Sequence, residues 1–178
     1  MGRHTPSSWV TFRSVSTLWC HKREIIDITE HLSDPREPEV VERGRSTYNK
    51  GLRVKFKRRV MRRGDYVASI DGLSEDGTQL LEILPMTGQS KRISDDIING
   101  NFNFAYRMKL EHMLFVSQAK EARIFLYQDE CPEEMKVMRM TPHPVNLTWM
   151  LTGWEYFQNK VSLGHQPVFD RTGIADWK

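Results

Sequence analysis

Cysteine is scarce in this chain, and so are long apolar runs. Only Cys20 and Cys131 occur among 178 residues, and two thiols can form neither a disulfide framework nor a four-thiolate zinc site. We therefore expect both thiols to be free, as in a reducing compartment. No stretch has the length and hydrophobicity of a membrane-spanning helix, and the first residues lack the apolar core of a secretory signal.

Sequence motifs of catalysis are absent as well. The sequence contains neither G-x-S-x-G nor a glycine-rich phosphate loop, and its His, Cys and acidic residues show no metal-site spacing. Adjacent acids such as Asp95-Asp96 and Glu133-Glu134 are typical of solvated loops. The sequence thus predicts a protein that is not an enzyme, with no cofactor, no metal and no small-molecule substrate.

Alternating hydrophobicity predicts strands through the middle of the chain. The predicted strands cover residues 52–60, 66–70, 78–84, 102–110, 124–127 and 137–140. A short helix is expected to start with Ser94 as its N-cap and to end at Gly100, and an apolar stripe predicts a longer helix over 147–161. This pattern indicates an α+β fold: a single domain with a mainly antiparallel twisted sheet and a packed C-terminal helix.

The predicted domain has irregular segments at its ends and in its first third. Residues 1–8 form a flexible N-terminus, 9–164 the globular domain with a first strand at 9–20, and 165–178 a C-terminal arm. Residues 33–51 contain two prolines and two glycines amid mixed charge and are predicted to be a mobile loop. The aromatic residues of the 102–110 strand are expected to face the core rather than to stack on bases.

Charge is concentrated in blocks although the net charge is only +3. Residues 52–63 carry seven basic side chains and no acid, whereas residues 64–86 carry five acids and no base. Strand alternation would place Arg53, Lys55, Lys57 and Arg59 on one face about 6.8 Å apart, within reach of successive phosphates. Protection of an edge strand and a nuclear-import signal are the alternatives. The predicted polyanion-binding residues are Arg53, Lys55, Lys57, Arg58, Arg59, Arg62 and Arg63.

Residues 124–130 read Ile-Phe-Leu-Tyr-Gln-Asp-Glu, a strand ending in tyrosine before an acid-rich turn. This segment resembles one in rhabdovirus matrix proteins, and the size is similar to that of the short matrix proteins of plant-infecting members. The resemblance implies a virion structural protein that self-associates and bridges the viral nucleocapsid or RNA to an anionic membrane through the basic strand. It also implies a location in the virion and host cytoplasm, peripheral at membranes. A small viral or phage RNA-binding accessory protein is the alternative.

Overall fold

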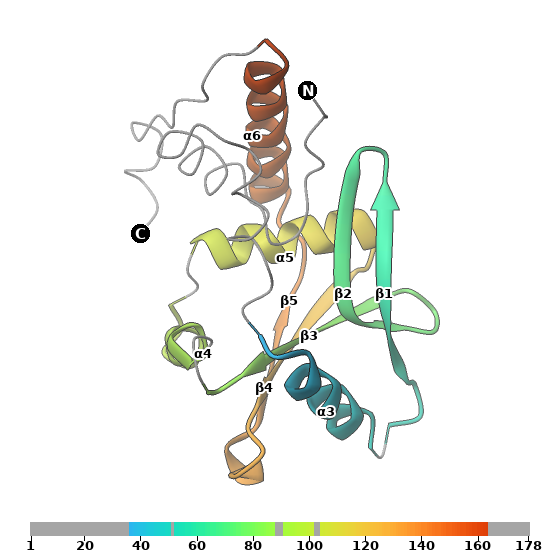
Figure 1. The fold of residues 1–178 in the computed structure, drawn as a ribbon, viewed down its shortest axis with the longest axis vertical. Coiled ribbons are helices and arrows are strands. Elements are labelled where there is room, and N and C mark those ends of the chain that lie inside the picture. The colour runs from blue at the N-terminus through green and yellow to red at the C-terminus, as the bar shows by residue number, and fades with distance from the viewer. Residues whose placement is uncertain (1–35, 51, 88–90, 102–103, 164–178) are drawn as a thin grey trace.

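A five-stranded sheet forms the centre of the molecule. The computed structural model describes residues 36–50, 52–87, 91–101 and 104–163. Neighbouring strands pair antiparallel except β3 and β4, which pair parallel, so the predicted α+β fold with a mainly antiparallel sheet is confirmed. In spatial order the strands are β1 (Phe56–Arg63), β2 (Tyr66–Ser74), β3 (Gln79–Pro85), β4 (Glu121–Tyr127) and β5 (Lys136–Met140) (Figure 1).

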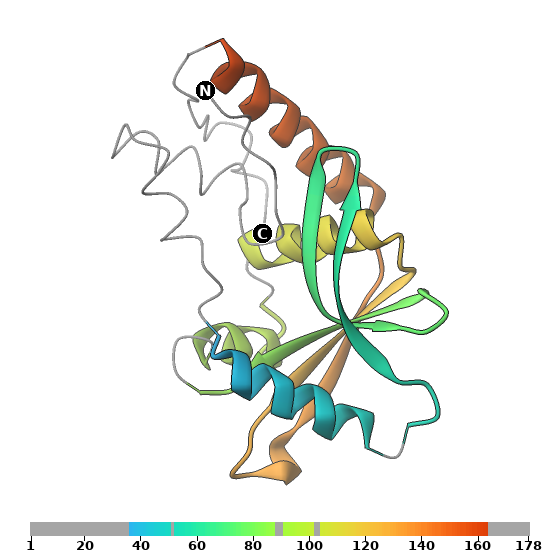
Figure 2. The same cartoon turned by 45° about the vertical axis from the view of Figure 1, so that its right-hand side comes forward.

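Helices cover both faces of this sheet. Side chains of β3 alternate between the two layers: Leu80 and Leu84 belong to the core beneath α5 (Phe104–Ser117), whereas Leu81 and Ile83 pack with α3 (Pro38–Asn49). The chain passes from β3 to β4 through α4 (Lys91–Ile98) and α5, the helical crossover that parallel strands require. The longest helix, α6 (Pro144–Ser162), follows β5 and contacts α5 (Figure 2).

The predicted mobile loop at 33–51 is wrong for residues 38–49, which form α3. Pro38 occupies the first turn, where a missing N–H costs nothing. Gly44 faces the sheet, and a Cβ atom there would lie 2.7 Å from Ile83 Cγ2. The proline and glycine taken as loop signals therefore start this helix and let it approach the sheet closely.

The predicted strand at 102–110 is also wrong, because residues from Phe104 onward form α5. The expected core placement of Tyr106, Met108 and Leu110 is confirmed, since all three are buried. Burial extends around α5 because the helix lies between the sheet and α6, and it includes Lys109 and Glu111. A helix buried on more than one side has no single apolar stripe, which explains why its apolar residues mimicked strand alternation.

Several local predictions agree with the structure. The turns at Gly64 and Gly77 have φ of 60° and 70°, a conformation that favours glycine, and α6 extends the expected C-terminal helix at both ends. Ser94 lies inside α4 rather than at its N-cap. Cys131 is a free thiol. The predictions for residues 1–8, 9–20 and 165–178, and for Cys20, lie outside the described residues.

Across the described residues, no helix combines the length and the hydrophobicity needed to span a membrane.

Candidate active site

Strands β2 and β3 separate from each other at Asp71. The two strands pair only through Gly72 with Leu81 and Leu73 with Leu80. The earlier residues of β2, 66–70, pair with β1 alone. The β1–β2 register shifts at the same place, so that Asp71 and Gly72 lie opposite Arg58 alone. Such bulges redirect side chains. Here the irregularity places the Asp71 carboxylate in the fork between the two strands.

Side chains satisfy the backbone of β3 at this fork. The N–H of Ile83 donates a hydrogen bond of 2.8 Å to Asp71 Oδ2, and its carbonyl oxygen accepts one of 2.5 Å from Arg36 Nη1. Without these two side chains, the N–H and the carbonyl of Ile83 would lack hydrogen-bond partners on this side, because β2 no longer pairs with β3 here. The fork is therefore held open by charged side chains.

Four charged residues meet in the fork. Arg36 Nη1 lies 2.5 Å from Asp71 Oδ2 and 3.1 Å from Glu82 Oε1, and Arg36 Nη2 lies 3.1 Å from Asp71 Oδ1. Lys109 reaches Glu82 Oε1 from α5. None of the four residues is more than 7% exposed. We call Arg36, Asp71, Glu82 and Lys109 the fork cluster; its formal charges balance.

Burial is the main cause of the pKa shifts of Glu82 and Lys109. Desolvation raises the pKa of Glu82, against the opposing attraction of Arg36 and Lys109. Desolvation also lowers the pKa of Lys109 to about 8, and the neighbouring Glu82 only partly offsets it. Glu82 Oε2 is buried and has no hydrogen-bond partner. A buried polar atom without a hydrogen-bond partner costs stability, and at this position it could accept a hydrogen bond from a ligand.

The oxygen atoms of the fork match the preferences of a hard divalent cation. No group of three His, Cys, Asp or Glu side chains that could hold a metal occurs in the described part of the chain. The fork instead offers two carboxylates, from Asp71 and Glu82, and the carbonyl of Ile83, all of which contact the single atom Arg36 Nη1. Carboxylate and carbonyl oxygens are the usual ligands of Mg²⁺ and Ca²⁺. The donor set therefore fits such a cation, at a point that a guanidinium now fills.

The predicted row of basic residues is not a single strand face. Because β1 begins at Phe56, Arg53 and Lys55 precede it, and Lys55 donates to the backbone of Asn49. The predicted burial of alternate apolar residues fails, since Val60 is 69% exposed. Both faces of this strand are largely open to solvent beyond Phe56, so alternation has no buried side to follow.

Two more of the basic residues are engaged within the molecule. Lys57 Nζ lies 3.3 Å from Glu75 Oε1. Arg63 donates to the carbonyl of Phe115, with its guanidinium carbon 4.2 Å from the centroid of that ring. The Lys57 pair is exposed on both sides and contributes little to stability, whereas the Arg63 contacts connect β1 to the end of α5.

Arg58, Arg59 and Arg62 remain exposed on β1, and none of them forms an ion pair with an acid in the described residues. Arg58 lies beside the fork, opposite Asp71 and Gly72. Desolvation lowers the pKa of the neighbouring Arg45, which donates to the Asp71 carbonyl, and the charge of Arg58 lowers it further. Arg58, Arg59 and Arg62 are named the hairpin arginines below: Arg58 lies nearest the fork cluster, and Arg59 and Arg62 follow it along β1 on opposite faces of the strand.

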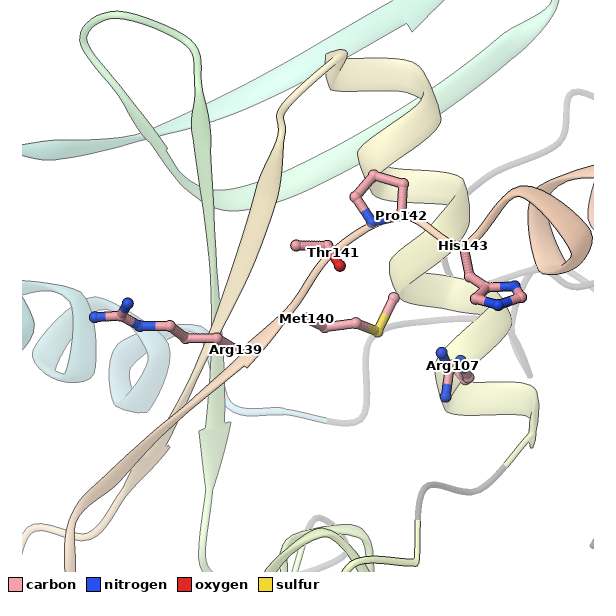
Figure 3. A pocket seen from close by; sticks show the side chains of 6 residues that line it. All are labelled: Arg107, Arg139, Met140, Thr141, Pro142 and His143. Carbon is pink, nitrogen blue, oxygen red and sulfur yellow. The ribbon is translucent and has the colours of Figure 1, made fainter.

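A small cavity of about 270 Å³ lies elsewhere, where β5 leads into α6 (Figure 3). Arg107, Arg139 and His143 are among the residues that line it. Glu111 accepts hydrogen bonds of 3.2 Å from the His143 backbone and of 3.4 Å from Asn146. The Glu111 carboxylate therefore accepts a hydrogen bond from the backbone N–H just before α6, and the cavity lies beside this helix cap.

The fold is similar to those of exonucleases of known structure. The alkaline exonuclease LHK-Exo from Laribacter hongkongensis is similar with a TM-score of 0.66 at 14% identity, over 90% of this chain and 89% of that one. A phage-related exonuclease from Haemophilus somnus 129PT has a TM-score of 0.56 at 8% identity, over 92% and 97%. A second LHK-Exo structure, in complex with dAMP, has a TM-score of 0.65 at 14% identity, over 90% and 89%. No family model matches the sequence, and no curated protein matches it.

The resemblance to rhabdovirus matrix proteins is wrong, because the fold is similar to that of the exonucleases named above and not to that of a matrix protein. The segment that carried it forms the end of β4, where residues 124–127 are all buried. An apolar strand followed by an acidic turn is common to many sheets and identifies no family. The predicted function as a non-enzymatic virion protein is wrong for the same reason, and so is the alternative of an RNA-binding accessory protein. The comparisons lend no support to a nucleocapsid or a membrane as partner.

Sequence reasoning missed every residue of the fork cluster. The available signal was an acid within an apolar strand: Asp71 follows Ala68 and Ile70, and Glu82 lies between Leu81 and Ile83. Acids in fully buried strands are rare unless they are paired or bind a ligand.

Proposed function

We propose that the protein hydrolyses phosphodiester bonds of nucleic acid at the fork cluster. The observation that carries this proposal is the convergence of oxygens from Asp71, Glu82 and Ile83 on one buried point, with Lys109 beside them. The fold shared with exonucleases, one of them seen with a bound nucleotide, supports the same substrate class.

In such a reaction a water oxygen bonds to phosphorus and one ester P–O bond breaks. The departing oxygen takes up a proton, which leaves a phosphomonoester and a hydroxyl end. Asp71, Glu82 and the Ile83 carbonyl would hold a divalent cation, which when bound supplies Lewis-acid polarisation of the phosphate. Lys109 Nζ is placed to donate to a phosphate oxygen, and Glu82 Oε2 is available to accept a hydrogen bond from water.

The hairpin arginines would hold the nucleic-acid backbone. Arg58, Arg59 and Arg62 are exposed, and Arg58 lies beside the fork. Guanidinium groups bind phosphate oxygens well and without reading bases. This retains the predicted polyanion role of the basic segment for these three residues, with nucleic acid as the polyanion.

The test is hydrolysis of end-labelled linear duplex and single-stranded DNA with Mg²⁺ or Mn²⁺, and with EDTA. We expect cation-dependent release of nucleotides, lost to below about a hundredth in Glu82→Gln and in Lys109→Met, since single preorganised groups contribute factors of this size. Arg43→Gln is the matched control, because Arg43 pairs with Asp129 on the exposed surface of the same molecule. Equal activity in Glu82→Gln and the control would contradict the proposal.

A further inference from the structure

We propose that Arg36 is a built-in competitor of the divalent cation, so that the active site opens only when this side chain leaves the fork. The inference rests on the proposed function for the identity of the site, and it concerns how that site is regulated. It follows from the contacts of one guanidinium and from the way Arg36 is attached to the fold.

The guanidinium and a cation cannot occupy the fork together. Arg36 Nη1 lies between 2.5 and 3.1 Å from oxygens of Asp71, Glu82 and Ile83. A bound Mg²⁺ or Ca²⁺ takes such oxygens at about 2.0–2.6 Å, which places it at the same point. The Arg36 side chain also balances the two carboxylates, jointly with Lys109. The guanidinium therefore occupies the position that a metal ion would take and supplies part of the positive charge that the ion would bring.

Arg36 can leave without unfolding the elements around it. It lies outside α3, separated from Pro38 by Glu37, the helix N-cap, which has an extended conformation. The helix itself is held to the sheet by Val41 and by the close approach of Gly44. Withdrawal of one side chain would leave these contacts in place. The fork thus has two arrangements, one filled by arginine and one open to a cation.

Competition of this kind lowers the apparent affinity for the cation by the fraction of molecules whose fork is open. Minor conformations typically make up about 0.1–10% of a population. Removal of the Arg36 charge should therefore tighten cation binding by roughly 10- to 1,000-fold.

The experiment measures Mn²⁺ binding without any nucleic acid. Free Mn²⁺ is followed by electron paramagnetic resonance, and the midpoint of thermal unfolding is recorded over the same titration. Wild type is compared with Arg36→Gln, with Arg36→Lys, which weakens the competitor because one nitrogen cannot also hold Asp71 Oδ1 as Arg36 Nη2 does, and with Arg43→Gln as the matched surface control. Asp71→Asn combined with each Arg36 variant tests whether the bound ion is in the fork.

We expect Arg36→Gln to bind Mn²⁺ at least about tenfold more tightly than wild type or Arg43→Gln, with a saturable rise in its unfolding midpoint that Asp71→Asn removes. If Arg36→Gln folds only with Mn²⁺, that also supports the proposal; if it does not fold at all, Arg36→Lys must show the tighter binding. Equal affinity in wild type and the variants that fold, or no binding in any of them, would overturn it. DNA hydrolysis by wild type alongside equal affinities would refute only the competition. Tighter binding by the variants without hydrolysis by any of them would refute only the nuclease function.

Discussion

The fork cluster and the hairpin arginines use similar side chains in opposite ways. In the fork, Arg36 and Lys109 are almost completely buried against two carboxylates. On β1, Arg58, Arg59 and Arg62 are exposed and lie only a few residues apart along the chain. The tertiary fold assembles the first group from β2, β3, α5 and the segment before α3. The second group comes from a single strand.

Solvent decides what each group contributes. Exposed charges are screened by water and salt, so the hairpin arginines contribute little to folding and remain available to a polyanion. Buried charges have lost their hydration, and each depends on its partner to compensate for that loss. Folding stability should therefore distinguish the two regions before any ligand is added.

The largest expected effect is on the buried side of this comparison. Lys109→Met leaves Glu82 with less positive charge nearby and should lower the free energy of unfolding by about 3–5 kcal/mol in urea denaturation. Lys109→Met combined with Glu82→Leu should recover much of this loss, since an apolar pair needs no compensation. Arg58→Met is the exposed counterpart and should change stability by less than about 0.5 kcal/mol. Similar losses in the two single variants would break the comparison.

A second buried group extends the comparison to pH. His112 Nε2 donates a hydrogen bond of 2.9 Å to the Val67 carbonyl oxygen, and its ring contacts those of Tyr66 and Trp154. Burial lowers the pKa of His112 from 6.5 to about 4. Between these values the unfolded chain binds the proton and the folded chain does not. Stability should therefore fall by roughly 3 kcal/mol as pH drops from 6.5 to 4.

Urea unfolding at several pH values measures this effect. His112→Phe should flatten the pH dependence in that range whatever its effect on stability at neutral pH. His143→Gln, which alters an exposed histidine, should leave the slope unchanged. An unchanged slope in His112→Phe would mean that other groups cause the acid sensitivity.

The smallest effect on folding, and the largest on binding, is expected at the hairpin. Replacing Arg58, Arg59 and Arg62 together by Glu should leave the unfolding free energy nearly unchanged. DNA affinity should fall, and the slope of log affinity against log salt should become shallower by about 3, roughly one for each lost phosphate contact. The control with the same change of charge replaces three exposed cations elsewhere in the described structure: Arg92, Lys120 and Lys136. Equal losses of binding in the two triple variants would indicate a general charge effect.

The sequence predicted the sheet better than it predicted the site. The turns at Gly64 and Gly77, the strands that flank them and the C-terminal helix depend on local patterns, and these predictions held. The fork depends on contacts between residues far apart in the chain. Local periodicity carries no information about which of these residues meet.

Each residue of the fork cluster was missed for its own physical reason. Arg36 was assigned to a mobile loop, because the proline and glycines around it look like breakers. Asp71 fell beyond the predicted end of its strand, which continues to Ser74 through an irregular pairing. Glu82 was counted only as part of an acidic block. Lys109 was placed on the polar face of a predicted strand, whereas the helix that replaces the strand buries it.

The central claim is that the point shared by Asp71, Glu82 and the Ile83 carbonyl is a cation site from which Arg36 must withdraw. The most direct measurement is an anomalous difference map from crystals soaked in Mn²⁺, collected for wild type and for Arg36→Gln at the same concentration. We predict a peak in the fork of Arg36→Gln, and in wild type a weaker peak accompanied by a displaced Arg36 side chain. A wild-type map with Arg36 in place and a full peak beside it, or a fork without a peak in both proteins, would contradict the claim.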